Sequence, residues 1–293
     1  MELALTDEQR MIQASAERFL NQVASSAAVR TAMTSDQGYD TATWARMARE
    51  LYWPALAIPE AYGGLGLGFV EVSLLQEQLG RCLLPTPFFA TCCLATPALL
   101  LSRNEALKER WLPLIAAGEI RASLAYTSAP RWDDSAVQVY AQSHAGGYRL
   151  NGEYHYVIDG SDCQLLIIAA RTPGSVGDAG IRLFALPSDT PGIVCQWQPT
   201  LDQTRRLATI TLNDVVVHDD QLLSEPGQGW PMLRDVLQIA CVGLAAEQTG
   251  GAQQSLDITL AYISGREQFG RTIASFQAIK HRCADLMLAI ECA

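Results

Sequence analysis

The sequence lacks a concentrated basic region, and this absence limits the partners that it can have. Its 293 residues include 21 lysines and arginines against 31 aspartates and glutamates, which gives a net charge of −10. No long run of positive residues interrupts this acidic balance. Because affinity for the nucleic-acid backbone depends on clustered positive charge, we do not expect nucleic acid as a main partner. A small anionic ligand remains compatible, since it needs only a local positive group or a helix N-terminus.

The sequence also lacks the spacing of cysteine and histidine that zinc sites use. Its eight cysteines are scattered, and only Cys92 and Cys93 are adjacent. No Cys-x-x-Cys pair and no matching Cys/His arrangement occurs. We therefore expect no metal site, and we expect reduced, mostly buried thiols.

Targeting and membrane-spanning segments are missing as well. The stretch from Met1 to Glu8 has no basic region followed by an apolar run, so it does not resemble a secretory signal. No apolar stretch is both long enough and free enough of charge to span a bilayer. These two absences predict a cytoplasmic protein that does not insert into membranes.

Helical periodicity dominates the first 118 residues. Thr6 is a suitable N-cap, and apolar side chains between Ile12 and Val23 then recur on one helical face. Further helical patterns cover residues 41–51, 70–82, 92–101 and 105–117. The glycine-dense segment 58–68 allows two interpretations, a phosphate-binding loop or a tight turn between helices. A phosphate loop needs a preceding strand and a correctly spaced lysine or ribose-binding acid, so the tight turn is favoured.

The pattern changes to a period of two residues at about Gly118, which indicates short strands. They are expected at residues 123–127, 137–141, 148–150, 154–158, 165–170, 182–186 and 209–212. Strands of this length and spacing are typical of a small β-barrel or sandwich. Residues 172–180 are rich in glycine, serine and proline and are expected to form a flexible loop without an assigned function.

The helical period returns after residues 227–229 and continues to about Tyr262. The sequence therefore predicts an α+β fold that is mostly helical, in three domains. They are a helical domain over 1–118, a β-barrel domain over 119–226, and the first helices of a helical bundle over 227–293.

Residues 266–285 carry the most specific pattern. We expect a helix that ends at Gly270, a connection with Ser275 as N-cap, and a second helix. The Arg266 to Gly270 run and the Phe276-Gln277 pair, together with Pro-Glu-x-Tyr-Gly-Gly-x-Gly at 59–66, resemble the acyl-CoA dehydrogenases. The domain order extends this resemblance over essentially the whole chain. It implies FAD as cofactor, an acyl-CoA substrate, an oligomer with identical or related chains, and electron-transfer flavoprotein or a similar acceptor.

The resemblance also implies cofactor-binding residues, and the barrel segments among them are altered. Tyr126, Thr127 and Ser128 begin the stretch that matches the family's Thr-Glu-Pro-Gly-x-Gly-Ser-Asp, but the glutamate and glycines of that pattern are absent. Tyr156, Val157 and Ile158 match the family's Trp-Ile-Thr beside the flavin. Ile158 cannot donate the hydroxyl hydrogen bond of that threonine. Taken without the family context, Tyr156 would be read as an ordinary half-buried strand aromatic.

The helical hairpin supplies the second group of implied cofactor residues. By resemblance, these five contact FAD that is bound mainly by a neighbouring subunit: Arg266, Gln268, Phe269, Phe276 and Gln277. A guanidinium offers a planar fork of donors for pyrophosphate oxygens and stays charged at any relevant pH. The alternative for these positions is a solvated arginine and a phenylalanine of the core.

The catalytic base is unknown. In most of the family the base is a glutamate on a late bundle segment, which would lie past Ala293. In a minority it lies early in the bundle, at the position of Ala240. Glu247 is two helical turns from Ala240, about 10 Å along the axis, which is too far to take the same proton. Glu291 is no better placed, and both glutamates are interpreted as structural.

Two hypotheses of function remain open. The first is an FAD-dependent acyl-CoA dehydrogenase of which this sequence is a fragment. The second is a non-catalytic or half-site subunit that a related chain completes, and the altered stretch after Tyr126 favours it. An acyl-CoA oxidase is a weaker third possibility. Apolar residues of the final helix, such as Ile279 and Leu286, are expected to lack their bundle partners unless another chain covers them. The acyl group of the substrate cannot be identified from these residues.

Overall fold

The computed structural model describes residues 4–293, so the first three residues of the expected N-terminal domain lie outside it. The chain packs as two compact units, each made from separate stretches of sequence. One contains the described residues up to Ala28 together with Ser73–Leu84 and Val242–Ala293. The other contains Val29–Val72 and Pro85–Cys241. The expected order of helices, then strands, then helices is confirmed, whereas the domain boundaries at 118 and 226 stay a prediction.

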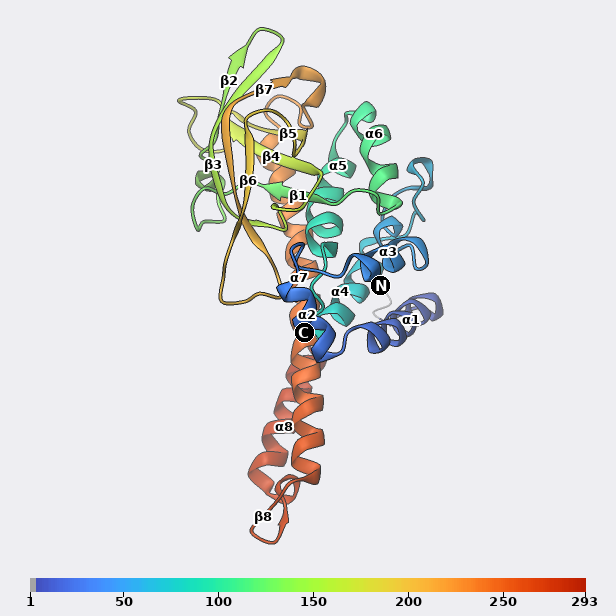
Figure 1. Cartoon of the computed structure of the whole chain (residues 1–293). Helices are drawn as coiled ribbons and strands as arrows, with labels where there is room; N and C mark the ends of the chain where they lie inside the picture. Colours follow the sequence, from blue (N-terminus) through green and yellow to red (C-terminus); the bar gives the residue numbers. More distant parts are fainter. Residues whose placement is uncertain (1–3) are drawn as a thin grey trace. The chain divides into compact units, whose positions relative to one another are not determined.

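The second unit is built around a seven-stranded curled sheet, which takes the place expected for the barrel (Figure 1). The strand order is β1-β4-β2-β3-β7-β6, and β5 also pairs with β4. The strands are β1 (Ala122–Ala125), β2 (Tyr140–His144), β3 (Gly147–Ile158), β4 (Leu165–Arg171), β5 (Ile181–Pro187), β6 (Ile193–Gln198) and β7 (Leu207–His218). Alternate side chains point inward and form one apolar core that includes Leu150, Tyr154 and Phe184.

Helical segments precede the sheet in the same unit. They include α2 (Ser26–Thr34, shared with the other unit), α3 (Thr41–Arg49), α5 (Thr96–Leu101) and α6 (Glu105–Ala116). A buried π-helical segment, Phe89–Ala95, runs directly into α5, and at its end the Thr96 N–H bonds to the carbonyl of Thr91 five residues earlier. Pro97 follows and has no N–H to offer the usual acceptor, which favours this wider winding. The sequence patterns predicted helix here but not its π form.

The glycine-dense segment is a tight turn. It is preceded by the short 3-10 helix Trp53–Ala55 and not by a strand, contains a second one at Glu60–Tyr62, and leads into α4 (Phe69–Cys82). Gly63 and Gly66 have positive φ, and a Cβ on Gly64 would lie 1.9 Å from the carbonyl oxygen of Ile58. Glycine is needed here because the chain folds tightly against itself.

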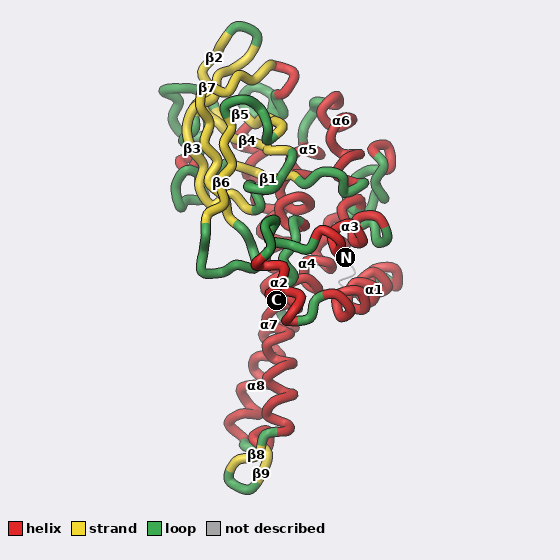
Figure 2. Tube along the Cα trace, viewed as in Figure 1, coloured by secondary structure: helices red, strands yellow, loops and turns green. Residues whose placement is uncertain are grey.

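The first unit consists of helices. Thr6 caps α1 (Asp7–Val23) through a capping box with Gln9, as the sequence predicts. The helix α7 (Gly229–Gly265) contributes its second half to this unit, and α8 (Gln277–Glu291) returns beside it (Figure 2). Residues of α4 pack on α7: Arg81 forms an ion pair with Asp257 at 2.8 Å, and Gln76 donates to Glu247 at 3.2 Å. Within residues 4–293, no helix is long and apolar enough to cross a membrane.

Two details of the predicted helical hairpin are wrong. The first helix ends at Gly265, not at Gly270, because the chain then forms a small β-hairpin of β8 (Glu267–Gln268) and β9 (Arg271–Thr272). Phe269 and Gly270 both have positive φ, as a two-residue turn between strands requires. Ser275 is not the N-cap of α8; its hydroxyl donates to the Thr272 carbonyl at 2.7 Å, and α8 begins after Phe276.

Candidate functional site

Two of the predicted segments lie side by side although about thirty residues separate them. The backbone N–H of His155 donates to the Thr127 carbonyl at 2.9 Å, and the Ser123 hydroxyl donates to the Ile158 carbonyl at 2.5 Å. The segment that leaves β1 is therefore joined to the end of β3. The structure thus brings Tyr126, Thr127 and Ser128 together with Tyr156, Val157 and Ile158.

A β-bulge in β3 decides which of these side chains is accessible. The pairing of β3 with β7 shifts register between Tyr154 and Val157, and Tyr156 has φ of 59°. In a regular strand Tyr154 and Tyr156 would share one face. Here Tyr154 is fully buried, Val157 is 2% exposed, and Tyr156 is 47% exposed. A non-glycine residue at positive φ is strained, and both such residues and bulges gather at functional sites.

The hydroxyl groups of the neighbouring segment bond mainly to their own chain. The Thr127 hydroxyl donates to the Ala129 carbonyl and accepts the Ala129 N–H. The Ser128 hydroxyl donates to the Glu153 carbonyl at 2.6 Å. Burial raises the pKa of Tyr126 to about 12, so its phenol stays protonated. Together with the apolar side chain of Ile158, this arrangement offers aromatic rings and backbone to a ligand more than free hydroxyls.

The other predicted residues lie on the α7–α8 hairpin of the first unit. Phe269 stands at the tip of the β8–β9 turn and is 92% exposed. Its ring lies edge-on to Phe276 with 6.3 Å between ring centres, and the Arg271 guanidinium lies 4.1 Å over Phe276. Arg266, Gln268 and Gln277 are exposed around this pair. Sequence reasoning missed Arg271, although an arginine one residue past the turn was a usable signal for a cation on the aromatic group.

The three positions considered for a catalytic base differ in their surroundings. Ala240 is buried on α7. The Glu247 carboxylate accepts a hydrogen bond from Gln76 of α4, which agrees with a structural role. Glu291 is exposed near the end of α8. Among residues 4–293, no group of three or more histidines, cysteines and acids could hold a metal ion.

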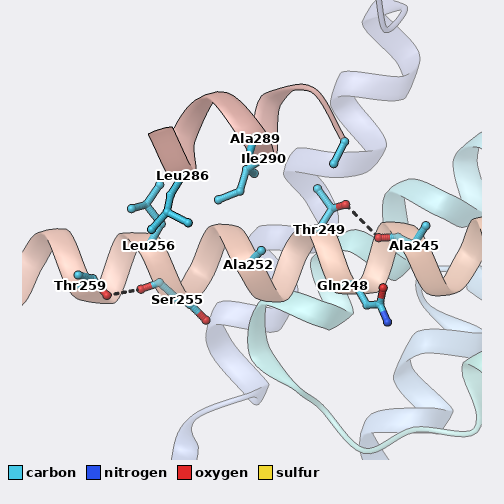
Figure 3. Close-up of a pocket in the computed structure, with 11 residues that line it drawn as sticks. Ala245, Gln248, Thr249, Ala252, Ser255, Leu256, Thr259, Leu286, Ala289 and Ile290 are labelled. Atoms are coloured by element: carbon cyan, nitrogen blue, oxygen red, sulfur yellow. Dashed lines mark hydrogen bonds between the residues drawn. The ribbon is translucent and has the colours of Figure 1, made fainter. Parts of the chain in front are cut away.

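A groove of about 610 Å³ lies along the α7–α8 hairpin (Figure 3). Leu256 of α7 faces Leu286 of α8. Side chains such as Ala252 and Ala289 are too small to fill the space between the two helices, so a groove remains there. The Thr249 hydroxyl is turned back to the Ala245 carbonyl of its own helix at 2.9 Å. The side chains that line the groove include no ionisable group, so it has the chemistry of a packing surface and not of a reaction site.

Comparison with known proteins matches both ends of the chain to one family. Residues 6–119 match the family described as acyl-CoA dehydrogenase, N-terminal domain, and residues 227–293 match acyl-CoA dehydrogenase, C-terminal domain. The relative named acyl-CoA dehydrogenase IpdE2, from Mycobacterium tuberculosis, is 31% identical over 287 residues, which cover 98% of this chain and 73% of the relative.

Solved structures give the same match for the fold. Butyryl-CoA dehydrogenase from Megasphaera elsdenii is 26% identical with a TM-score of 0.90, over 100% of this chain and 78% of that chain. A structure described as PigA with FAD and proline is 27% identical with a TM-score of 0.88, over 99% of this chain and 77% of that chain.

Proposed function

Because the chain belongs to the acyl-CoA dehydrogenase family, we propose that it takes part in the FAD-dependent α,β-dehydrogenation of an acyl-CoA thioester. One observation carries the proposal. The two segments that the family resemblance assigns to the cofactor, at 126–128 and 156–158, lie beside each other, since the His155 N–H donates to the Thr127 carbonyl and the Ser123 hydroxyl donates to the Ile158 carbonyl, and a strained bulge exposes Tyr156 there. Such strain persists only where the surrounding structure holds it, which supports a binding role for this part of the sheet.

The side chains here fit a flat conjugated group better than they fit a strongly polar one. Tyr156 offers an exposed ring, and Tyr126 adds a protonated phenol. Thr127 and Ser128 hold the local backbone in place through their hydroxyls, and Val157 anchors the bulge in the core. When bound, FAD supplies the acceptor for the hydride that leaves the β-carbon of the acyl group. The role of these residues is to bind and orient its ring.

The exposed tip of the α7–α8 hairpin is the second part of the proposed cofactor site. We infer that Arg266 and Gln268 donate hydrogen bonds to the polar part of FAD held by another subunit, while Phe269 and Phe276 offer aromatic surface and Gln277 a further donor. Phe269 is 92% exposed and lies edge-on to Phe276, and contact with another chain would cover this aromatic surface. This part of the proposal requires an oligomer of identical or related chains.

A second candidate function rests on Ala240. Removal of the α-proton needs a general base within hydrogen-bond reach, and a methyl side chain at this position supplies none. If the family's early position is the one that matters here, the chain is a half-site subunit and a related chain provides the base. Electron-transfer flavoprotein or a similar acceptor remains the proposed oxidant of the reduced cofactor in both cases, and a cytoplasmic location remains a prediction.

Reconstitution with FAD tests the proposal. The purified chain is incubated with FAD, separated from the free cofactor, and measured for visible absorbance and native mass. We expect retained flavin on an oligomer, and a Tyr156→Ala variant that retains less. A colourless protein after reconstitution, alone and with a related chain, would overturn the proposal.

Addition of acyl-CoA thioesters to the flavin-loaded protein separates the two candidates. Bleaching of the flavin absorbance by the chain alone supports the self-sufficient enzyme. Bleaching only after a related chain is added supports the half-site subunit. No bleaching by any acyl-CoA of short, branched or steroid type in either preparation would contradict both.

A further inference from the structure

Arg171, the last residue of β4, is an arginine with unusually many backbone partners. Its side chain is only 11% exposed. The guanidinium donates to the carbonyls of Val137 at 2.6 Å and Asp134 at 2.7 Å, and to those of Ser175 and Gly177, both at 3.1 Å. The Asp134 carboxylate lies 3.9 Å away. One buried cation therefore joins two separate loops of the sheet unit.

The first of these loops is continuous with the proposed cofactor segment. Residues 128–136 form a closed loop, because the Ser128 N–H donates to the Ala136 carbonyl at 2.9 Å. Asp133 closes the inner turn by accepting the Ser135 N–H at 3.0 Å. Arg171 donates to the Asp134 carbonyl inside this loop and to the Val137 carbonyl just after it, while Thr127 and Ser128 at the start of the loop are hydrogen-bonded to β3.

The chemistry of these contacts calls for a guanidinium. Arginine carries five N–H donors in a rigid plane, and hydrogen bonds from a charged donor are stronger than neutral ones. A lysine ammonium at this site would reach fewer of the four carbonyls, which come from two directions. The Asp134 carbonyl also accepts the Val137 N–H at 3.2 Å, so the loss would fall mainly on the carbonyls of Val137, Ser175 and Gly177. A largely buried carbonyl that loses its partner favours local opening of the chain to water.

We propose that Arg171 is a positioning residue, which holds the 128–136 loop and with it Tyr126, Thr127 and Ser128 in the form that the cofactor meets. Only the effect on cofactor binding rests on the proposed function. The holding of the loop is a property of the protein without cofactor, and it can be measured separately.

Arg182 of β5 provides a matched control in the same sheet. Its guanidinium donates to the Thr172 hydroxyl at 2.7 Å, to the Gly180 carbonyl at 3.3 Å and to the Tyr148 hydroxyl at 3.2 Å. These bonds fix the 172–180 loop, which Arg171 also contacts, but they do not involve residues 128–137. An Arg182→Lys variant therefore makes the same chemical change at the shared loop and at Tyr148, without touching residues 128–137.

Hydrogen exchange of the full chain without FAD is the first measurement. In Arg171→Lys we expect exchange in peptides covering 129–137 to rise by about tenfold or more, because local opening there becomes easier. In Arg182→Lys the rise should appear at 172–180 and near Tyr148, and exchange in 129–137 should stay as in the wild type. Equal exchange of 129–137 in Arg171→Lys and wild type would overturn the proposal. So would unprotected exchange of this loop in the wild type, a result that does not depend on the folding of any variant.

Flavin affinity is the second measurement, by fluorescence titration with FAD. We expect Arg171→Lys to bind FAD about tenfold more weakly and Arg182→Lys to bind within about twofold of wild type. A loosened loop with unchanged FAD affinity would overturn the positioning role. If the wild type binds no FAD, the proposed function fails and with it the cofactor step, while the exchange result still decides whether Arg171 holds the loop.

Discussion

Tyr156 and Phe269 share a backbone conformation that neither residue type favours, with φ of 59° and 55°. Each costs of the order of 1–3 kcal/mol in a non-glycine residue. The family resemblance selects both residues for cofactor contact, and in both cases the strained backbone exposes an aromatic ring. The coincidence of strain, exposure and aromatic surface strengthens the proposal at the level of single side chains.

The turn at Phe269 allows folding and binding to be separated. Asparagine adopts positive φ more readily than phenylalanine and is favoured in two-residue hairpin turns. We expect Phe269→Asn to have an unchanged or slightly higher melting temperature, measured by circular dichroism. Its affinity for FAD should fall by roughly three- to tenfold, since an aromatic contact is lost. Phe269→Tyr keeps the ring and should keep the affinity; equal weakening in both variants would contradict an aromatic role.

A single carboxylate in the first unit gives a pH-dependent prediction. Partial burial raises the pKa of Glu77 above its ordinary value of 4.5; nearby Arg81 opposes this shift and Glu291 adds to it. A raised pKa in the folded state means that the folded chain holds the proton more tightly than the unfolded chain. The free energy of unfolding therefore falls as pH rises from below 4.5 through the raised pKa.

In the Glu77→Gln variant the side chain is neutral at every pH, so its free energy of unfolding should not fall in this way as pH rises. The stability of the variant relative to wild type should increase between about pH 4 and about pH 7.5, measured by denaturant unfolding at both pH values. A difference between the two proteins that stays the same across this range would show that burial of Glu77 is unimportant.

At the scale of elements, α4 and α7 touch through glycine. A Cβ on Gly80 would lie 2.0 Å from the carbonyl oxygen of Glu247, and a Cβ on Gly250 would lie 1.9 Å from that of Glu77. Each glycine thus faces the backbone of the other helix, and neither distance is possible for a real side chain. The ion pair of Arg81 with Asp257 lies on the same pair of helices.

Adjacent glycines in α7 should respond oppositely to the same substitution. Gly250→Ala must push the helices apart and should destabilise the chain by about 1–3 kcal/mol. Gly251→Ala meets only the Gly80 carbonyl oxygen, at an ordinary 3.5 Å. It should stabilise by about 0.5–1 kcal/mol, because alanine favours a helix more than glycine does. Thermal unfolding of both variants is the measurement, and equal effects would refute the close crossing.

At the scale of the whole molecule, exposed apolar side chains on α8 are a surface that the proposed oligomer would cover. Met287 and Leu288 are both more than half exposed, and the proposed site at the tip of the same hairpin needs a second chain. We expect the double variant Met287→Glu, Leu288→Glu to show a lower native mass than the wild type by analytical ultracentrifugation. Val176→Glu, a change at an exposed valine of the 172–180 loop, serves as control. An unchanged mass in the double variant would show that this helix is not an interface.

Local pattern was a good guide to the type of most elements in this molecule. The capping box at Thr6, the apolar periodicity of α1 and α7, and the apolar strand residues of β4 and β5 depend on neighbours in sequence, and these elements were predicted. The strand β3 was expected as two short strands, at 148–150 and 154–158, but it is continuous. The first helix of the hairpin was extended too far, because Phe269 and Gly270 can end a helix or form a strand turn. Only pairing across that turn distinguishes the two outcomes.

In the candidate site, too, some features follow from local sequence and others from contacts between distant residues. The sequence by itself determined the family, the identities of Arg266, Phe269 and Phe276, and the change from glycine to bulky residues after Thr127, because these are properties of residue type and order. Tertiary structure decided that Tyr156 is exposed, that residues 126–128 lie against 156–158, and that Arg171 binds two loops. A β-bulge, a pairing register and the reach of a buried guanidinium depend on residues far apart in the chain, which no local pattern records.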